Sequence, residues 1–219
     1  VSLDVKNKQG ETPLIVLASQ GLSNAVQTLL DAKATVNAKD ERKKTALQRA
    51  LGAGHNATAK LLAETRDQVG ATALCAAAAS GDMALLYQLI AAGVSLDMRV
   101  LSESTPLILA AIEGRLNFVD ALVKAGAQLD LADGDGDTAL ICAVSLDDVD
   151  VAQYLLEAKA SVSIKNKFGE TALDIALHNG NDTLIRILAD VTNDFGDNAV
   201  FAAARAGDIG LLKRLIAAN

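Results

Sequence analysis

The sequence predicts an all-α fold built from a linear array of helix-turn-helix repeats. One observation is a short signature that returns along the whole chain: Thr or Asn, then Pro or Ala, then Leu or Val. Successive copies are separated by 33, 27, 33, 33, 33 and 27 residues, and a fixed period of this size is typical of repeat proteins. The composition agrees, because 51% of residues are hydrophobic but only 3% are aromatic, which suits thin layers of aliphatic side chains. The seven copies begin at Thr12, Thr45, Thr72, Thr105, Thr138, Thr171 and Asn198.

Each signature is placed to start a short helix. In the first repeat, Thr12 can cap a helix whose first residue is Pro13, where the missing N–H would have had no partner in any case. Gly21 can end this helix by taking the left-handed conformation. A second helix follows, with Val26 and Leu30 at the spacing of one inward stripe. A polar turn then leads to the next Thr.

This pattern resembles the ankyrin repeat. The family line Asp-x-x-Gly-x-Thr-Pro-Leu-His-x-Ala-Ala-x-x-Gly, a second helix rich in Val and Leu, and a closing Gly-Ala-Asp-Val-Asn-Ala fit residues 7–39, 100–132 and 133–165 without gaps. Lys43 and Glu103 replace the turn glycine, Asp147 replaces the mid-repeat glycine, and no repeat keeps the His after Leu. The resemblance covers essentially the whole chain and implies one solenoid domain of about seven units with β-hairpin loops. The units are expected at about 7–39, 40–66, 67–99, 100–132, 133–165, 166–192 and 193–219.

The two steps of 27 residues indicate a larger period. After Ala63 and after Ala189, the six residues that would build the outgoing hairpin arm are missing. Thr72 and Asn198 are separated by 126 residues, and at this offset other segments match as well, such as Gly81 and Gly207. We infer that a block of four repeats was duplicated. The hairpin row is therefore expected to be shortened after the second and sixth units, which would change the curvature through residues 62–72.

Composition excludes several functional classes. A net charge of -7 argues against a nucleic-acid or anionic-membrane surface, and no stretch of eighteen apolar residues or signal peptide predicts membrane insertion. Cys75 and Cys142 lie two repeats apart, too far for a disulfide, and are interpreted as reduced thiols of an intracellular, cytoplasmic protein.

The chain starts at Val1 inside a recognisable repeat, so we expect a fragment of a larger ankyrin-repeat protein. We also expect it to be a monomer.

No motif predicts catalysis, a metal or a cofactor. The acidic run at residues 133–137 resembles a calcium loop, but the EF-hand pattern needs Gly and Glu where Thr138 and Val144 stand. His55 follows the mid-repeat glycine, where a structural role is expected. His178 has no acidic or thiol partner within sequence reach, and we interpret it as a surface residue. The sequence therefore predicts a protein that is not an enzyme.

The resemblance implies that the chain binds a protein or peptide on a concave surface formed by the turn tips and the outward side of the first helices. Phe168 and Phe195 stand at turn tips, where an exposed ring can anchor an interface or pack on the next turn. The charge of the tips alternates along the chain, which favours either an elongated partner or a merely solvated face. The matching positions are Glu41, Arg42, Lys44, Leu101, Ser102, Ser104, Ile112, Glu113, Asp135, Asp137, Ser145, Leu146, Lys167, Phe168, Glu170, His178, Asn179, Asp194, Phe195 and Arg205.

Two alternatives stay open from the sequence. The chain could be the regulatory or substrate-recruiting arm of a larger enzyme whose catalytic domain lies outside this span. The block duplication also suits a mechanical or structural repeat array, in which length matters more than any one contact.

Overall fold

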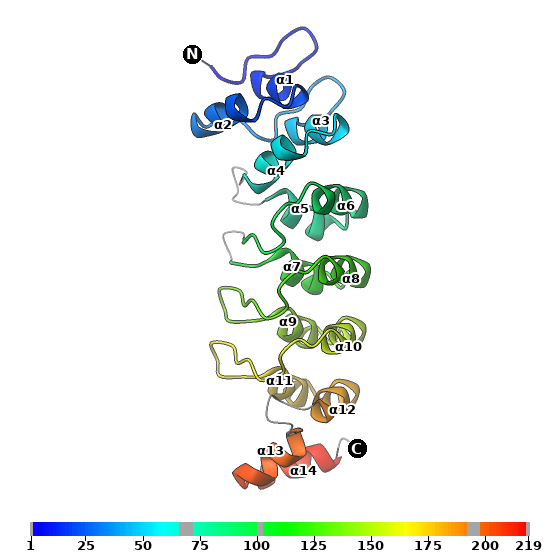
Figure 1. Cartoon of the computed structure of the whole chain (residues 1–219). Helices are drawn as coiled ribbons and strands as arrows, with labels where there is room; N and C mark the ends of the chain where they lie inside the picture. Colours follow the sequence, from blue (N-terminus) through cyan, green and yellow to red (C-terminus); the bar gives the residue numbers. More distant parts are fainter. Residues whose placement is uncertain (1, 66–71, 100–102, 192–197, 218–219) are drawn as a thin grey trace. The chain divides into compact units, whose positions relative to one another are not determined.

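The protein is an all-α chain of paired helices, as the sequence predicts (Figure 1). The computed structural model describes residues 2–65, 72–99, 103–191 and 198–217. Contacts divide the chain into two compact parts, Val1–Leu101 and Ser102–Asn219, which are described separately. The longest helices in the described ranges have nine residues, too few to cross a lipid bilayer.

The N-terminal part contains three helix pairs. They are α1 (Pro13–Ser19) with α2 (Ser23–Asp31), α3 (Ala46–Gly52) with α4 (Asn56–Glu64), and α5 (Ala73–Ser80) with α6 (Met83–Ala91). The first helix α1 packs on the first helix α3, and the second helix α2 packs on the second helix α4.

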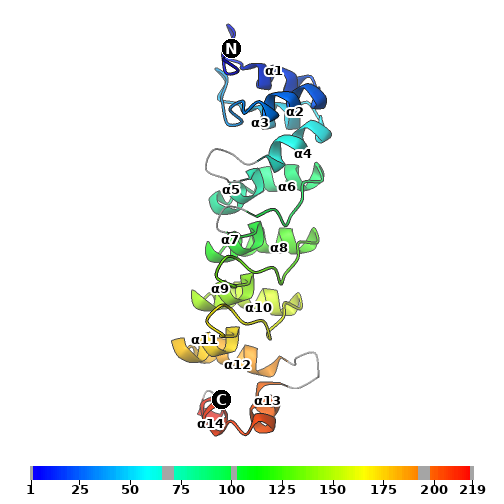
Figure 2. The same ribbon diagram turned by 90° about the vertical axis from the view of Figure 1, so that its left-hand side faces the viewer.

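The C-terminal part contains four pairs arranged in the same way. They are α7 (Pro106–Ile112) with α8 (Leu116–Lys124), α9 (Ala139–Ser145) with α10 (Val149–Glu157), α11 (Ala172–Asn179) with α12 (Asp182–Asp190), and α13 (Ala199–Ala206) with α14 (Ile209–Ala217). The first helices α7, α9 and α11 form one row, and α8, α10 and α12 form the other (Figure 2).

The signature residues act as the predicted caps. In every first helix, the side chain of the signature Thr or Asn accepts a hydrogen bond from the backbone N–H three residues later, as Thr138 does from Ile141 at 3.3 Å. In the first six repeats, the second residue after the cap is a Leu, and Leu14 and Leu140 are almost completely buried. Each first helix is followed by a residue with positive φ, and at one repeat this residue is Asp147, with φ of 57°.

The loops differ from the predicted β-hairpins. Among the described residues, extended pairing is limited to one isolated bridge between Ala132 and Thr138. Four loops instead form the same tight turn, in which the first residue's side-chain oxygen accepts backbone N–H groups of the turn. These side-chain bonds satisfy donors that a strand ladder would otherwise use, so the arms stay turns. The residues that organise them are Asn7, Asp40, Asp133 and Asn166.

Neighbouring turns contact each other through their backbones. The N–H of Glu41 donates to the carbonyl of Gln9 at 3.2 Å, and the N–H of Lys167 donates to that of Asp135 at 2.9 Å. Gly136 has φ of 83° and lies in this contact, because an added Cβ would be 2.9 Å from the Lys167 nitrogen. The turn glycine is therefore required here for close approach as well as for its conformation.

The two shortened connections change the local packing. Within the two parts, α1 packs on α3, α7 on α9 and α9 on α11, whereas α4 contacts both α5 and α6, and α12 contacts both α13 and α14. The first helices that precede these connections, α3 and α11, begin with capping boxes in which Gln48 and Asp174 bond back to the cap. Both side chains are exposed, whereas the equivalent Ile108 and Ile141 are buried. The predicted curvature change involves residues 66–71, which lie outside the described ranges.

A polar contact joins second helices of the C-terminal part. The hydroxyl of Tyr154 on α10 donates to Asp120 on α8 at 2.7 Å, and Lys124 lies 2.8 Å from the same carboxylate. The hydrogen bonds from Lys124 and Tyr154 lower the pKa of Asp120 below its ordinary value. The hydrogen bond to Asp120 also raises the pKa of Tyr154 to about 12.

Replacement of Tyr154 by Phe is expected to weaken the pH dependence of stability. Because the folded-state pKa of Asp120 lies below the unfolded value, its stabilisation is complete above that value and is lost as the pH falls through the folded pKa. Removal of the Tyr154 hydroxyl moves this pKa back up, so the stability difference from the unsubstituted chain should shrink below about pH 4. Urea unfolding of both chains at several pH values measures this difference in the free energy of unfolding. Tyr87→Phe, at an exposed tyrosine, is the control and should show no pH-dependent difference.

Two glycine substitutions separate conformational strain from turn contact. Gly136 and Gly169 occupy equivalent positions, with φ of 83° and 80°, but a Cβ at Gly169 meets no described atom within 4 Å. Ala at either position should lose about 1 kcal/mol through left-handed strain. Gly136→Ala should lose roughly 1 kcal/mol more, because its methyl group would push the Lys167 backbone away. Equal losses in urea unfolding would show that the turn contact contributes nothing.

Candidate partner-binding grooves

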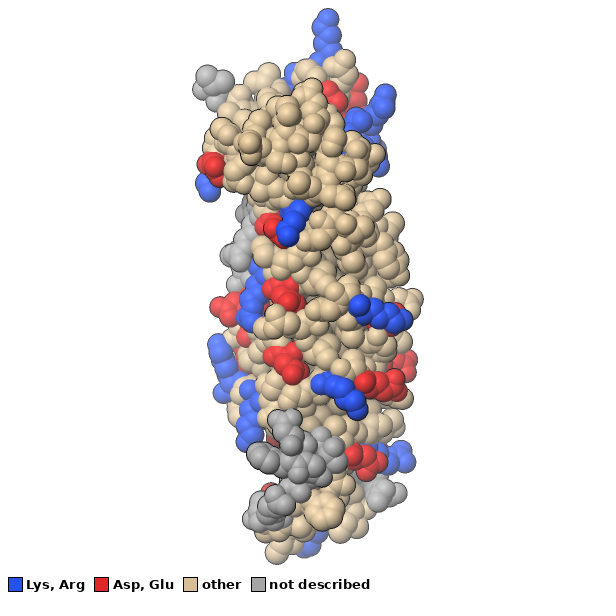
Figure 3. Space-filling view, in the orientation of Figure 1, with Lys and Arg blue, Asp and Glu red and all other residues tan. Residues whose placement is uncertain are grey.

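We call the turns together with the exposed side of the first helices the tip face of each part. Exposed residues on it include Phe168, at 77%, and Leu146, at 56%. Ser104 is buried, so its side chain does not contribute to the surface. Acidic and basic side chains both appear along the edge from which the C-terminal turns project (Figure 3). Four predicted residues, Leu101, Ser102, Asp194 and Phe195, and the side chain of Arg205 fall outside the described part of the chain.

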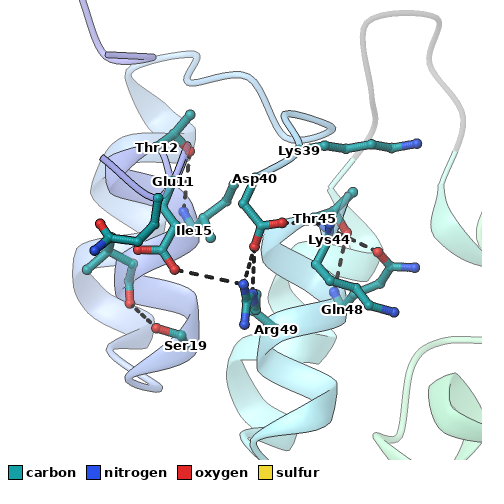
Figure 4. Close-up of polar contacts among 12 residues, drawn as sticks. Glu11, Thr12, Ile15, Ser19, Lys39, Asp40, Lys44, Thr45, Gln48 and Arg49 are labelled. Carbon is teal, nitrogen blue, oxygen red and sulfur yellow. Dashed lines mark hydrogen bonds and ion pairs between the residues drawn. The ribbon is translucent and has the colours of Figure 1, made fainter. Parts of the chain in front are cut away.

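The tip face of the N-terminal part contains an open groove of about 490 Å³, which we call the first groove. One of its lining residues, Arg49 on α3, bonds through its guanidinium to Asp40 and lies 4.0 Å from a carboxylate oxygen of Glu11 (Figure 4). The backbone N–H of Lys44 and the Arg49 side chain lower the pKa of the buried Asp40 carboxyl. The groove is lined by Ser19, Lys44, Gln48, Arg49, Gly52, Ala53 and Gln88.

The C-terminal part contains an open groove of about 370 Å³, which we call the second groove. Its carboxylates are Asp137, from the turn before α9, and Glu170, from the turn before α11. Burial raises the pKa of Asp137, and the neighbouring Asp133, Asp135 and Glu170 charges add to this effect. The groove is lined by Asp137, Ser145, Asn166, Phe168, Glu170, Ile175, His178 and Asn179.

Asp137 is incompletely satisfied. Its Oδ1 atom is buried and has no hydrogen-bond partner among the described residues, although Asn166 bonds to the same carboxyl group. The neighbouring Asp133 behaves differently, because its Oδ1 accepts the N–H groups of Asp135 and Asp137 at 2.9 and 3.0 Å. The acidic run thus contains one carboxylate used by the turn and another that faces the groove.

The two grooves occupy equivalent places when the sequence is compared at an offset of 126 residues. Adding 126 to the residue numbers of the first groove gives residues of the second at five lining positions. The chemistry nevertheless differs, because Lys44 is replaced by Glu170 and Arg49 by Ile175. The other equivalent pairs are Ser19 with Ser145, Gly52 with His178, and Ala53 with Asn179.

Sequence reasoning identified most of the second groove but little of the first. Asp137, Glu170 and His178, which the sequence predicts as binding positions, lie together in the second groove. Sequence reasoning missed Arg49 and Ile175, because the pattern of a single repeat predicts that these positions serve the packing of the first helix. The offset of 126 residues, applied position by position, was the signal that could have found them. Other predicted residues, including Glu41, Arg42, Ile112, Glu113, Asp135, Leu146 and Lys167, do not line either groove.

The two cysteines and His55 lie outside the grooves. Burial raises the pKa of the Cys142 thiol to about 12, so it is protonated at neutral pH, and both cysteines are buried and form no disulfide. The ring of His55 packs against Gly21, and its Nε2 lies 3.1 Å from the carbonyl oxygen of Ser19. In the part of the chain that the structure describes, no group of three His, Cys, Asp or Glu side chains is placed to hold a metal ion.

Comparisons with known proteins agree with this architecture. A family model described as ankyrin repeats in three copies matches residues 1–73 and again 74–166. No curated protein matches the chain. The structure is similar to the ankyrin repeat domain of Bcl-3, a member of the IkappaB protein family, with a TM-score of 0.61 and 26% identity over 85% of each chain. It is also similar to an ankyrin repeat domain from Acinetobacter baumannii AYE, with a TM-score of 0.58 and 26% identity over 80% of this chain and 95% of that one.

Domains of this kind generally serve as protein-interaction modules. Because the family model covers well over half of the sequence and the paired helices repeat with the expected caps, the chain belongs to the ankyrin-repeat family.

Proposed function

We propose that this chain is a non-enzymatic scaffold that binds a protein or peptide on its tip face, which corresponds to the concave surface implied by the family. The observation that carries the proposal is the pair of open grooves at equivalent positions on this face. Their volumes are large enough to receive several side chains of a partner. The exposed ring of Phe168 at the edge of the second groove is the kind of residue that anchors interfaces.

The polar groups of the grooves suit recognition better than catalysis. The second groove contains Ser145 and His178, which could suggest a nucleophile and a base. The Ser145 hydroxyl, however, donates to the carbonyl of Ile141 at 2.8 Å, a bond that holds it against its own helix. In the first groove, Arg49 is engaged with Asp40 and Glu11. Side chains held in this way present a fixed pattern of charge, which favours selective binding.

The rest of the tip face contributes contacts around the grooves. Glu41, Arg42, Asp135 and Lys167 stand on turns, and Leu146 follows α9. In this proposal they form the rim of the interface and contribute mainly to orientation, because exposed charges are weakened by water and salt.

Site-specific photo-crosslinking tests the proposal. A benzoylphenylalanine at Lys44 or His178 on the tip face should produce crosslinks to a partner protein in cells. The matched controls are Gln27 on α2 and Gln153 on α10, which are exposed on second helices. Crosslinks from the tip positions and not from the controls are the expected result. Crosslinks confined to Gln27 and Gln153 would place the interface on the opposite side and contradict the proposal.

A further inference from the structure

We propose that the second groove binds a guanidinium group, carried by an arginine of the partner, at the place that the chain's own Arg49 occupies in the first groove. This inference rests on the proposed function and names the chemistry that the second groove recognises. It comes from the comparison of two equivalent grooves within one chain, of which only the first supplies its own cation.

The first groove shows how the site is satisfied when a cation is present. Arg49 bonds to Asp40 through both Nε and Nη2, and Nη2 also lies 4.0 Å from Glu11. The guanidinium is therefore held between two carboxylates from successive turns (Figure 4). A planar group with several fixed donors suits this bridging position.

The second groove retains a carboxylate but lacks the cation. At an offset of 126 residues, Glu11 corresponds to Asp137, Asp40 to Asn166, and Arg49 to Ile175. The Asn166 side chain bonds to Asp137, yet Asp137 Oδ1 remains buried without a hydrogen-bond partner among the described residues. Asp137 lines the groove, so a donor that a ligand brings to this carboxylate would offset part of the cost of burying it.

The replacement of Lys44 by Glu170 points to the same ligand. In the first groove this position carries a positive charge, whereas in the second it places another carboxylate in the lining. The charge of Glu170 also raises the pKa of Asp137, so the two carboxyl groups are electrostatically coupled. A single cation between them relieves their repulsion and is attracted by both.

The apolar residues of the groove suit the stem of an arginine. Ile175 and Phe168 both line this groove: Ile175 is half-buried and replaces the polar side chain of Arg49, and Phe168 is 77% exposed. The methylene groups of an arginine can lie along Ile175 while its guanidinium reaches the carboxylates. The ring of Phe168 offers a face on which a guanidinium can stack.

Peptide selection provides the probe. A phage-displayed library of random 12-residue peptides would be selected against the full chain, and the peptides that bind would be synthesised. We expect enrichment of arginine. Replacement of that arginine by citrulline, which has nearly the same shape but no charge, should weaken binding about tenfold or more. Replacement by lysine should also weaken binding, because an ammonium group lacks the planar fork.

Variants of the chain locate the interaction. Asp137→Asn and Glu170→Gln should each weaken the arginine peptide about tenfold. In Asp137→Asn, the arginine and citrulline peptides should bind almost equally, because the charged pair has already been removed. Glu11→Gln, the equivalent change in the first groove, is the matched control and should leave the affinity for the peptide unchanged.

Ile175→Arg installs the cation of the first groove in the second. It should block the arginine peptide while leaving the helical circular dichroism spectrum unchanged. If this variant does not fold, the asparagine and glutamine variants, which alter no side-chain volume, carry the test.

The inference is overturned if the selected peptides lack arginine, if citrulline binds as well as arginine, or if the affinity is unchanged in both Asp137→Asn and Glu170→Gln. A selection that yields no binding peptide also overturns it. Peptides that protect the tip face from crosslinking, but whose affinity is the same for these variants as for the unsubstituted chain, would leave the proposed function intact. They would reject only the arginine site. The two proposals therefore fail in distinguishable ways.

Discussion

The structure depends on the burial of small apolar side chains between successive first helices. These helices are only seven or eight residues long, so no single repeat can shield its own apolar side or form a stable helix alone. Ala18, Ala50 and Ala143 are completely buried, and their small size allows neighbouring layers to approach closely. Stability is therefore a property of adjacent pairs of repeats, and the residues that face away from these contacts remain free to vary.

Local chemistry explains why much of the fold could be predicted. The cap at Thr138 and the positive φ that ends each first helix depend on only a few neighbouring residues, so the sequence shows them directly. The shape of the loops was harder to predict, because Asp133 and Asn166 satisfy backbone donors through their side chains and remove the need for strands. The packing of α4 against both helices of the next repeat depends on contacts between repeats, which no local pattern reveals.

The grooves show how one backbone supports two different surfaces. Their equivalent positions have the same helices and turns beneath them, yet Arg49 and Ile175 give the two sites different chemistry. The sequence showed which positions were free, but it did not show that Asp137 has a buried oxygen without a donor, because this depends on the spatial placement of Asn166. Function in such an array belongs to the side chains that the repeat leaves unassigned.

The polar capping boxes of α3 and α11 bear on how such an array grows. At these two places, Gln48 and Asp174 occupy a position that holds a buried isoleucine in three other repeats. A block of repeats that ends next to a polar helix terminus can be duplicated or joined without exposing a further apolar side chain at that position. The repeats that carry these boxes are the ones that end at the two shortened connections, so the inferred block would end on a repeat whose first helix starts with a polar side chain.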